Sequence, residues 1–135
     1  MEYLTRVGGL AIRENKVLAV RNKTSPIYLI PGGILEKRET NKQALIRELD
    51  EELNAKLVSS KIFKTYYSSK ALFHDTPLKL VTFLVEIDGK LRPGHEILEY
   101  VWLTATDYKS NRYELAPIFG QQVIPDLCKE GYLKF

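Results

Sequence analysis

Hydrophobic and polar residues alternate with two different periods along the chain, and these periods separate the expected strands from the expected helices. Two β-rich runs near the start, joined by the polar tripeptide 14–16, predict a β-hairpin. Two other segments, 41–53 and 113–130, have the 3.6-residue periodicity of helices. Runs rich in Val, Ile, Leu, Phe and Tyr predict strands at 3–13, 17–22, 27–30, 57–67, 78–87 and 100–103. Strands, helix, strands and helix follow in this order, which indicates an α/β fold with one sheet between helices.

Turn and cap residues mark the ends of two of these segments. Pro31-Gly32-Gly33 is expected to end the strand that precedes it. Thr40 and Gln43 have the T-x-x-Q spacing of a capping box, which predicts a helix that begins at Asn41. Asn54 can adopt the left-handed conformation that ends a helix, so the helix is expected to stop there.

The helix expected at 41–53 carries a close group of acidic residues. Its apolar side chains share one face on a helical wheel, which we expect to pack on the sheet: Leu45, Ile46, Leu49 and Leu53. Glu48, Glu51 and Glu52 fall within an arc of about 100° on the other side, with Arg47 at its edge. Like charges at this spacing repel by a few tenths of a kcal/mol, whereas a divalent cation among them would reverse the effect. A solvated acidic face is the simpler interpretation of the triplet alone.

The spacing of residues around this helix is far more specific than the acidic group itself. Gly33, five residues, Glu39, seven residues and Arg47-Glu48-Leu49-Asp50-Glu51-Glu52 follow one another. Chance produces such a match about once in ten million starting positions. Segment 33–55 resembles the Nudix box, G-x5-E-x7-R-E-U-x-E-E-x-G-U with U a bulky apolar residue, of hydrolases that act on nucleoside diphosphates linked to another group. Asn54 and Ala55 depart from the last two box positions.

The resemblance implies a fold and a metal site. The expected fold is the α/β/α sandwich of the Nudix family, with a mixed β-sheet between helices and one domain over residues 1–135. Glu48, Glu51 and Glu52 would bind Mg²⁺ or Mn²⁺, and the carbonyl of Gly32 would add a ligand. Glycine at 32 and 33 is also expected on physical grounds, because a side chain there would keep the backbone away from a metal or a phosphate.

The resemblance also implies residues that orient the glutamates and accept a proton. Arg47 and Glu39 would hold the metal-binding carboxylates in place and so support catalysis, while a surface salt bridge is the alternative for Arg47. A carboxylate must take a proton from the attacking water. The candidates for this base are Glu51, Glu52, Glu96 and Glu99.

The reaction implied by the resemblance is metal-assisted hydrolysis of a phosphoanhydride bond in a nucleotide. The short chain looks most like the MutT-type branch, which converts nucleoside triphosphates to monophosphates and pyrophosphate. Residues 71–73 carry neither the proline of ADP-ribose pyrophosphatases nor the tyrosine of diadenosine polyphosphate hydrolases. An ADP-ribose or nucleotide-sugar substrate, an RNA 5′ end, and a non-catalytic nucleotide sensor stay open. Arg6, Arg21 and Tyr28 are weak candidates for substrate binding.

The charge balance, the cysteine count and the apolar runs of the chain limit its expected binding partners and its expected location in the cell. The 135 residues include 20 Lys and Arg against 17 Asp and Glu, a net charge of +3 without a basic cluster, which argues against nucleic acid as a partner. Cys128 is the single cysteine, so an internal disulfide is excluded. No apolar run approaches the ~20 residues of a membrane span, and charges interrupt the start of the chain too early for a signal peptide. We expect a cytoplasmic protein that binds a small nucleotide, with a homodimer as one candidate state.

Overall fold

The computed structural model describes residues 2–70 and 75–135, so the segment 71–73 lies outside the described residues. The described residues form seven strands in one sheet, and one long helix is followed by shorter helical segments near the C-terminus. The elements are β1 (Leu4–Arg13), β2 (Lys16–Asn22), β3 (Tyr28–Leu29), β4 (Gly32–Ile34), α1 (Asn41–Leu53), β5 (Lys56–Ser68), β6 (Leu78–Asp88), β7 (Ile97–Leu103), α2 (Ala105–Lys109), the π-helical turn η1 (Phe119–Val123) and α3 (Ile124–Lys129). None of the described helices is both long enough and apolar enough to span a membrane.

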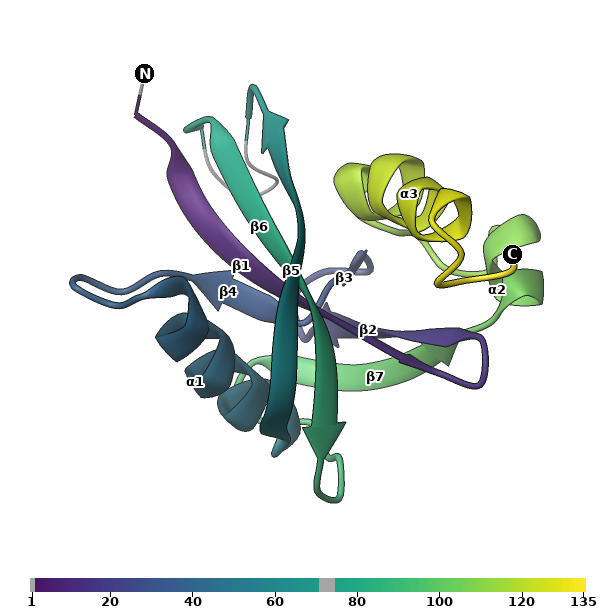
Figure 1. The fold of residues 1–135 in the computed structure, drawn as a ribbon, viewed down its shortest axis with the longest axis horizontal. Coiled ribbons are helices and arrows are strands. Elements are labelled where there is room, and N and C mark those ends of the chain that lie inside the picture. Colours follow the sequence, from purple (N-terminus) through teal and green to yellow (C-terminus); the bar gives the residue numbers. More distant parts are fainter. Residues whose placement is uncertain (1, 71–74) are drawn as a thin grey trace.

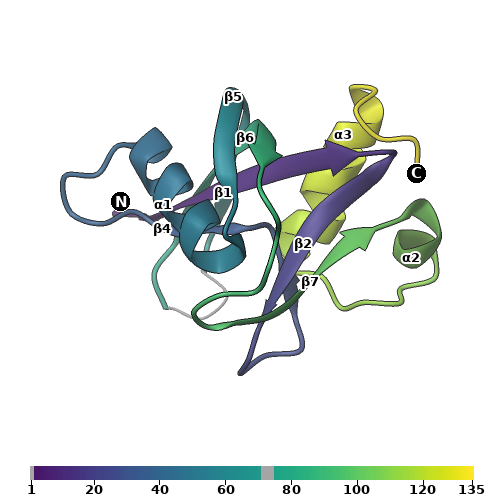
Figure 2. The same ribbon diagram turned by 90° about the horizontal axis from the view of Figure 1, so that it is seen from below.

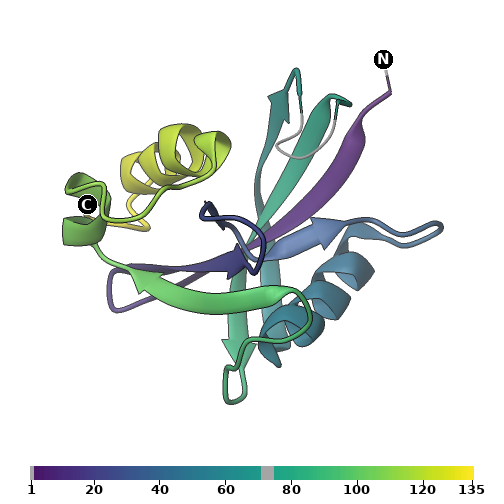
Figure 3. The same cartoon turned by 180° about the vertical axis from the view of Figure 1, so that it is seen from behind.

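Strand β1 is the centre of the sheet. It pairs in parallel with β6 over its length, and it pairs antiparallel with β2 at one end and with β4 at the other. The strand order is β3-β2-β1-β6-β5, with β4 added on β1 and β7 added on β2 (Figure 3). The sheet therefore contains parallel and antiparallel pairs, and the predicted mixed sheet is confirmed.

The two faces of this sheet bury two apolar clusters, because alternate residues of β1 point in opposite directions. Val7 and Ala11 pack with α1, whereas Leu10 packs with η1 and α3. Helices α1 and α3 accordingly lie on opposite sides of the strands (Figures 1 and 2). This arrangement confirms the α/β/α sandwich expected from the sequence.

The predicted hairpin at 14–16 is confirmed. Glu14 and Asn15 both have positive φ, at 50° and 58°, which is the backbone twist that a two-residue hairpin turn needs. The strand before Pro31-Gly32-Gly33 ends as predicted, since β3 stops at Leu29, but the two glycines also begin β4, which the sequence did not predict, and pair with Val7 and Gly8 of β1.

The C-terminal quarter differs from the single helix predicted at 113–130. Residues near Leu115 are extended because they pair with β3, where Tyr28 donates its N–H to the Glu114 carbonyl and accepts one from Ala116. Helical conformation begins at Pro117, which suits a residue without a backbone N–H. The five-residue helix α2 was not predicted from the sequence.

Candidate active site

Helix α1 begins and ends where the sequence predicts. The Thr40 side chain accepts a hydrogen bond from the Gln43 N–H, and the Gln43 side chain accepts one from the Thr40 N–H, so the capping box is complete. Asn54 has φ 56° and ψ 32°, the left-handed conformation expected for the residue that follows the helix. The three box glutamates are therefore held on a well-defined helix.

The face that α1 buries differs from the predicted one. Leu45, Leu49 and Leu53 are buried as expected, but Ile46 is 46% exposed. Glu52 is buried instead, with only 5% of its surface exposed. The helix is rotated toward β4, so Glu48 and Glu52 face protein on the side where solvent was expected.

The two glycines of β4 allow this contact between a strand and a helix. A Cβ atom on Gly33 would overlap the Glu48 carboxylate, and a Cβ atom on Gly32 would overlap the Val7 carbonyl oxygen. Gly32 also has φ 151°, which disfavours other residues. The Gly32 N–H donates to Oε1 of Glu52 at 2.8 Å. Glycine is therefore required at position 33 by the close approach of the Glu48 carboxylate, and at position 32 by the Val7 carbonyl and the positive φ.

Arg47 connects the acidic residues of the site. Its Nε and Nη2 atoms donate to the two carboxylate oxygens of Glu39 at 2.7 and 2.8 Å, a two-pronged ion pair. Its Nη1 atom contacts Glu48 at 2.6 Å and Glu51 at 3.4 Å. These hydrogen bonds lower the pKa of Glu39 to about 2, with a further contribution from the Glu36 N–H. Arg47 is thus held by Glu39 and contacts two of the three box glutamates.

Burial dominates the titration of the two inner glutamates. Loss of solvent raises the pKa of Glu52 to about 8, although the charge of Arg6 and the Gly32 N–H act in the opposite direction. Loss of solvent also raises the pKa of Glu48, against the effect of Arg47. A carboxylate that is costly to ionise is stabilised in its charged form by a nearby cation.

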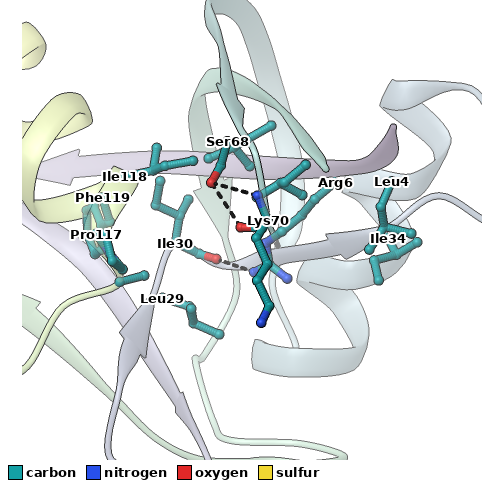
Figure 4. Close-up of a pocket in the computed structure, with 13 residues that line it drawn as sticks. Leu4, Arg6, Leu29, Ile30, Ile34, Ser68, Lys70, Pro117, Ile118 and Phe119 are labelled. Atoms are coloured by element: carbon teal, nitrogen blue, oxygen red, sulfur yellow. Dashed lines mark hydrogen bonds between the residues drawn. The ribbon is translucent and has the colours of Figure 1, made fainter. Parts of the chain in front are cut away.

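A polar cleft of about 300 Å³ opens beside these residues, and its charged lining residues are Arg6, Glu36, Arg47, Glu48, Glu52 and Glu96. A second cavity of about 160 Å³ adjoins it (Figure 4). Its apolar lining includes Leu4, Ile30, Leu78, Leu80 and Phe119. Arg6, Leu29 and Ile34 line both spaces, so the polar cleft and the apolar cavity meet at these three side chains.

Three residues that the sequence suggested as site residues lie together outside the polar cleft. Glu99 accepts a hydrogen bond from the Tyr28 hydroxyl, and its Oε1 lies 3.4 Å from Nε of Arg21. Tyr28 is buried in the core and packs edge to face with Tyr113. These contacts connect β2, β3 and β7, and none of the three residues is among those lining the cleft. Glu96 does line the cleft, and its charge acts on Glu52.

A family model described as NUDIX domain matches residues 2–127. The chain belongs to the Nudix family. Four key residues of the Nudix box line the polar cleft, namely Gly33, Arg47, Glu48 and Glu52, and members of the family generally use divalent metal ions.

Two curated Nudix relatives are similar to this chain. It is 28% identical over 141 positions to the 8-oxo-dGTP diphosphatase of Buchnera aphidicola subsp. Schizaphis graminum, covering 99% of this chain and 100% of that protein. It is 28% identical over 96 positions to the ADP-ribose pyrophosphatase of Methanocaldococcus jannaschii, covering 69% of this chain and 57% of that protein. The chain thus spans little more than half of the archaeal relative.

The fold has close structural counterparts. The solved structure of a NUDIX hydrolase from Nitrosomonas europaea superimposes with a TM-score of 0.81 at 18% identity, covering 99% of this chain and 97% of that one. A likeness at this identity establishes the Nudix fold alone.

The donor set of the Nudix box suits a hard divalent cation, since it consists of carboxylate oxygens beside a backbone carbonyl. Within residues 2–70 and 75–135, no three acidic, histidine or cysteine side chains already converge on a point that could hold a metal ion. Arg47 contacts Glu48 and Glu51, and the Gly32 N–H contacts Glu52. A cation would therefore compete with these contacts, and the buried Glu52 carboxylate gives it a favourable partner.

Sequence reasoning underrated one cation and missed the apolar cavity. Arg47 was expected beside the glutamates and Arg6 was only a weak candidate for substrate binding, whereas the structure brings both into the cleft. The alternation of β1 contains a clue, because Arg6 shares a face with Leu4 and Leu10, two residues that lie in apolar surroundings. The cavity is made by segments far apart in the sequence, so no local pattern reveals it.

Proposed function

We propose that this Nudix chain is a metal-dependent pyrophosphohydrolase that converts a nucleoside triphosphate to a nucleoside monophosphate and pyrophosphate. One observation carries the proposal: Glu48 and Glu52 of the box line a polar cleft that meets an apolar cavity at three shared residues. A nucleotide has matching parts, since its phosphates are charged while its base presents broad apolar faces.

Glu48, Glu51 and Glu52, together with the Gly32 carbonyl, are the groups that would hold Mg²⁺ or Mn²⁺. When bound, such an ion supplies a Lewis acid for phosphate oxygens and lowers the pKa of a water molecule. Arg47 would keep Glu48 and Glu51 oriented, because Glu39 fixes its guanidinium group from the opposite side. This division of roles agrees with the contacts of each side chain.

The base that accepts the proton of water must face the cleft. Glu52 and Glu96 line it, whereas Glu51 and Glu99 are not among its lining residues. Glu99 is engaged by Arg21 and the Tyr28 hydroxyl instead. We therefore favour Glu52 or Glu96 as the base.

The names of the relatives supply two candidate substrates. The bacterial relative that aligns over its whole length is named as a diphosphatase of an oxidised nucleoside triphosphate, which favours a triphosphate here. ADP-ribose is the second candidate, because the archaeal relative is named as an ADP-ribose pyrophosphatase. Both substrates contain a phosphoanhydride bond next to a nucleoside.

A substrate panel tests the proposal. The protein is incubated with Mg²⁺ or Mn²⁺ and with dNTPs, 8-oxo-dGTP, ADP-ribose or triphosphorylated RNA, and the products are separated by ion-exchange chromatography. At least one triphosphate should yield its monophosphate and pyrophosphate, and EDTA should stop the reaction. Glu51→Gln should lower turnover by at least ~10²-fold. Asp50→Asn is the matched control, because Asp50 is exposed on the same helix.

Other outcomes of the panel separate the candidates. Cleavage of ADP-ribose without cleavage of any triphosphate would assign the second substrate. No product from any compound would refute the hydrolase assignment, whereas full turnover by Glu51→Gln would refute the assignment of Glu51 to the metal site. The cytoplasmic location, the homodimer, the single domain over residues 1–135 and the lack of a nucleic-acid partner stay predictions from the sequence.

A further inference from the structure

Arg6 occupies an unusual place for a cation. It lies in the middle of the sheet, on β1, opposite Ile34 of β4 and Leu80 of β6. Its side chain reaches the Ile30 carbonyl, to which Nη2 donates at 2.8 Å (Figure 4). The guanidinium group lies at the boundary between the polar cleft and the apolar cavity, since Arg6 lines both.

The charge of Arg6 has no carboxylate in direct contact among the described residues. No ion pair within 4.0 Å joins Arg6 to an acidic side chain of that part of the chain. The other two cations that line the two spaces are engaged, Arg47 by the box glutamates and Lys70 by Asp75 at 3.1 Å. Arg6 thus differs from both in having its charge available to a ligand.

The hydrogen-bonding capacity of Arg6 is also largely unused. A guanidinium group has five N–H donors in a fixed plane, and the Ile30 carbonyl takes one of them. No described side-chain nitrogen or oxygen is both buried and unpartnered, so the donors that Ile30 leaves over border the open cavities. A planar group with several free donors suits a phosphate, which accepts two parallel hydrogen bonds.

We propose that Arg6 binds the phosphate next to the nucleoside, with the nucleoside in the apolar cavity and the remaining phosphates in the glutamate cleft. This inference rests on the proposed function, because it presumes a nucleotide ligand. This role would explain why the cation Arg6 lies in a partly apolar place. Phosphates that enter a cleft with several glutamates need a positive group that is not already neutralised. Arg6 would also set the boundary between the two parts of the substrate.

Binding measured without metal tests the role of Arg6 apart from catalysis. Calorimetry in EDTA compares dGMP, 8-oxo-dGMP and AMP with their nucleosides, for the wild type and for Arg6→Met. At least one monophosphate should bind the wild type about tenfold or more tightly than its nucleoside, and Arg6→Met should remove this difference. Arg13→Met is the matched control and should keep it. Arg13 is the other arginine of β1 that donates Nη2 to a backbone carbonyl, that of Ile87, outside both spaces.

A second substitution covers a loss of folding in Arg6→Met. Arg6→Lys keeps the charge but not the planar donors, so it should fold and bind the monophosphate with intermediate affinity. Equal binding of every monophosphate and its nucleoside by the wild type would overturn the inference. A folded variant at position 6 that lacks the charge and keeps the phosphate preference would also overturn it.

The two proposals can fail separately. If the wild type binds a monophosphate through Arg6 but hydrolyses nothing in the substrate panel, the role of Arg6 stands and the hydrolase assignment falls. If the wild type hydrolyses a triphosphate while Arg6→Met binds the monophosphate as the wild type does, only the role of Arg6 falls.

Discussion

The burial of Glu52 makes a quantitative prediction about stability in the absence of metal. The pKa of this carboxyl group is about 8 in the folded protein and about 4.5 as its ordinary value. One pKa unit corresponds to about 1.4 kcal/mol, so ionising Glu52 in the folded, metal-free protein costs up to about 5 kcal/mol. The cost arises because only 5% of the Glu52 surface is exposed and its carboxylate accepts a hydrogen bond from one backbone N–H, that of Gly32.

The direction of the pH dependence follows from the raised pKa. Below about pH 4.5, Glu52 is protonated in both the folded and the unfolded chain, and its contribution to stability is complete. Between about pH 4.5 and 8 the unfolded chain loses this proton while the folded chain keeps it, so the free energy of unfolding falls as the pH rises. Above about pH 8 the loss is complete.

Glu52→Gln isolates this effect, because glutamine is neutral at every pH and can still accept the Gly32 N–H. Urea unfolding in EDTA is measured from pH 5 to pH 9 for both proteins. The variant should become more stable relative to the wild type by several kcal/mol across this range, and Glu48, which is present in both, largely cancels in the difference. Saturating Mg²⁺ should restore the wild type at pH 8 more than the variant. A difference that stays constant within about 0.5 kcal/mol from pH 5 to pH 9 would refute the reasoning.

Three further substitutions test the site. Gly33→Ala should lower the affinity for Mg²⁺ by at least tenfold, because the added methyl group would displace the Glu48 carboxylate. Calorimetry measures the affinity for Mg²⁺, and an unchanged value would show that Glu48 is not a ligand. Glu96→Gln should lower turnover at least ~10²-fold if Glu96 is the base, whereas Glu99→Gln should lower it by less than tenfold. Kinetics with the best substrate of the panel compare the two, and an equal loss in both would contradict the placement of Glu99 outside the cleft.

Features that depend on neighbours in the sequence were predictable. The bounds of α1 follow from a capping box at one end and an asparagine with left-handed conformation at the other. The box motif also identified Arg47 and Glu39, and the structure places them in a direct two-pronged contact. In each case the interacting groups lie within one helix or just before it, so spacing alone defines their geometry.

Features that depend on distant segments were not predictable. Hydropathy places Ile46 on the buried face of α1, but the backbone of β4 lies beside Glu52 at the other edge of that face, so Glu52 is buried and Ile46 is exposed. Likewise, the residues around Leu115 are apolar enough for a helix, yet they are extended because they pair with Tyr28 of β3. A residue pattern gives the preference of a segment, while the hydrogen bonds offered by a distant strand decide its conformation.

The placement of Arg6 and Glu52 shows what such long-range pairing achieves. Each is a charged group in a poorly solvated place, and burial acts on the pKa of both. A direct ion pair would be the simplest way to stabilise two such groups, and yet the guanidinium contacts Ile30 while the carboxylate contacts Gly32. Both residues line the polar cleft, so the cleft contains a basic and an acidic group that are not paired with each other. A ligand that combines a cation with a phosphate matches this separation, because each part meets the group of opposite charge. The separation of two buried charges is therefore the structural feature that most directly favours a metal-bound nucleotide as the ligand.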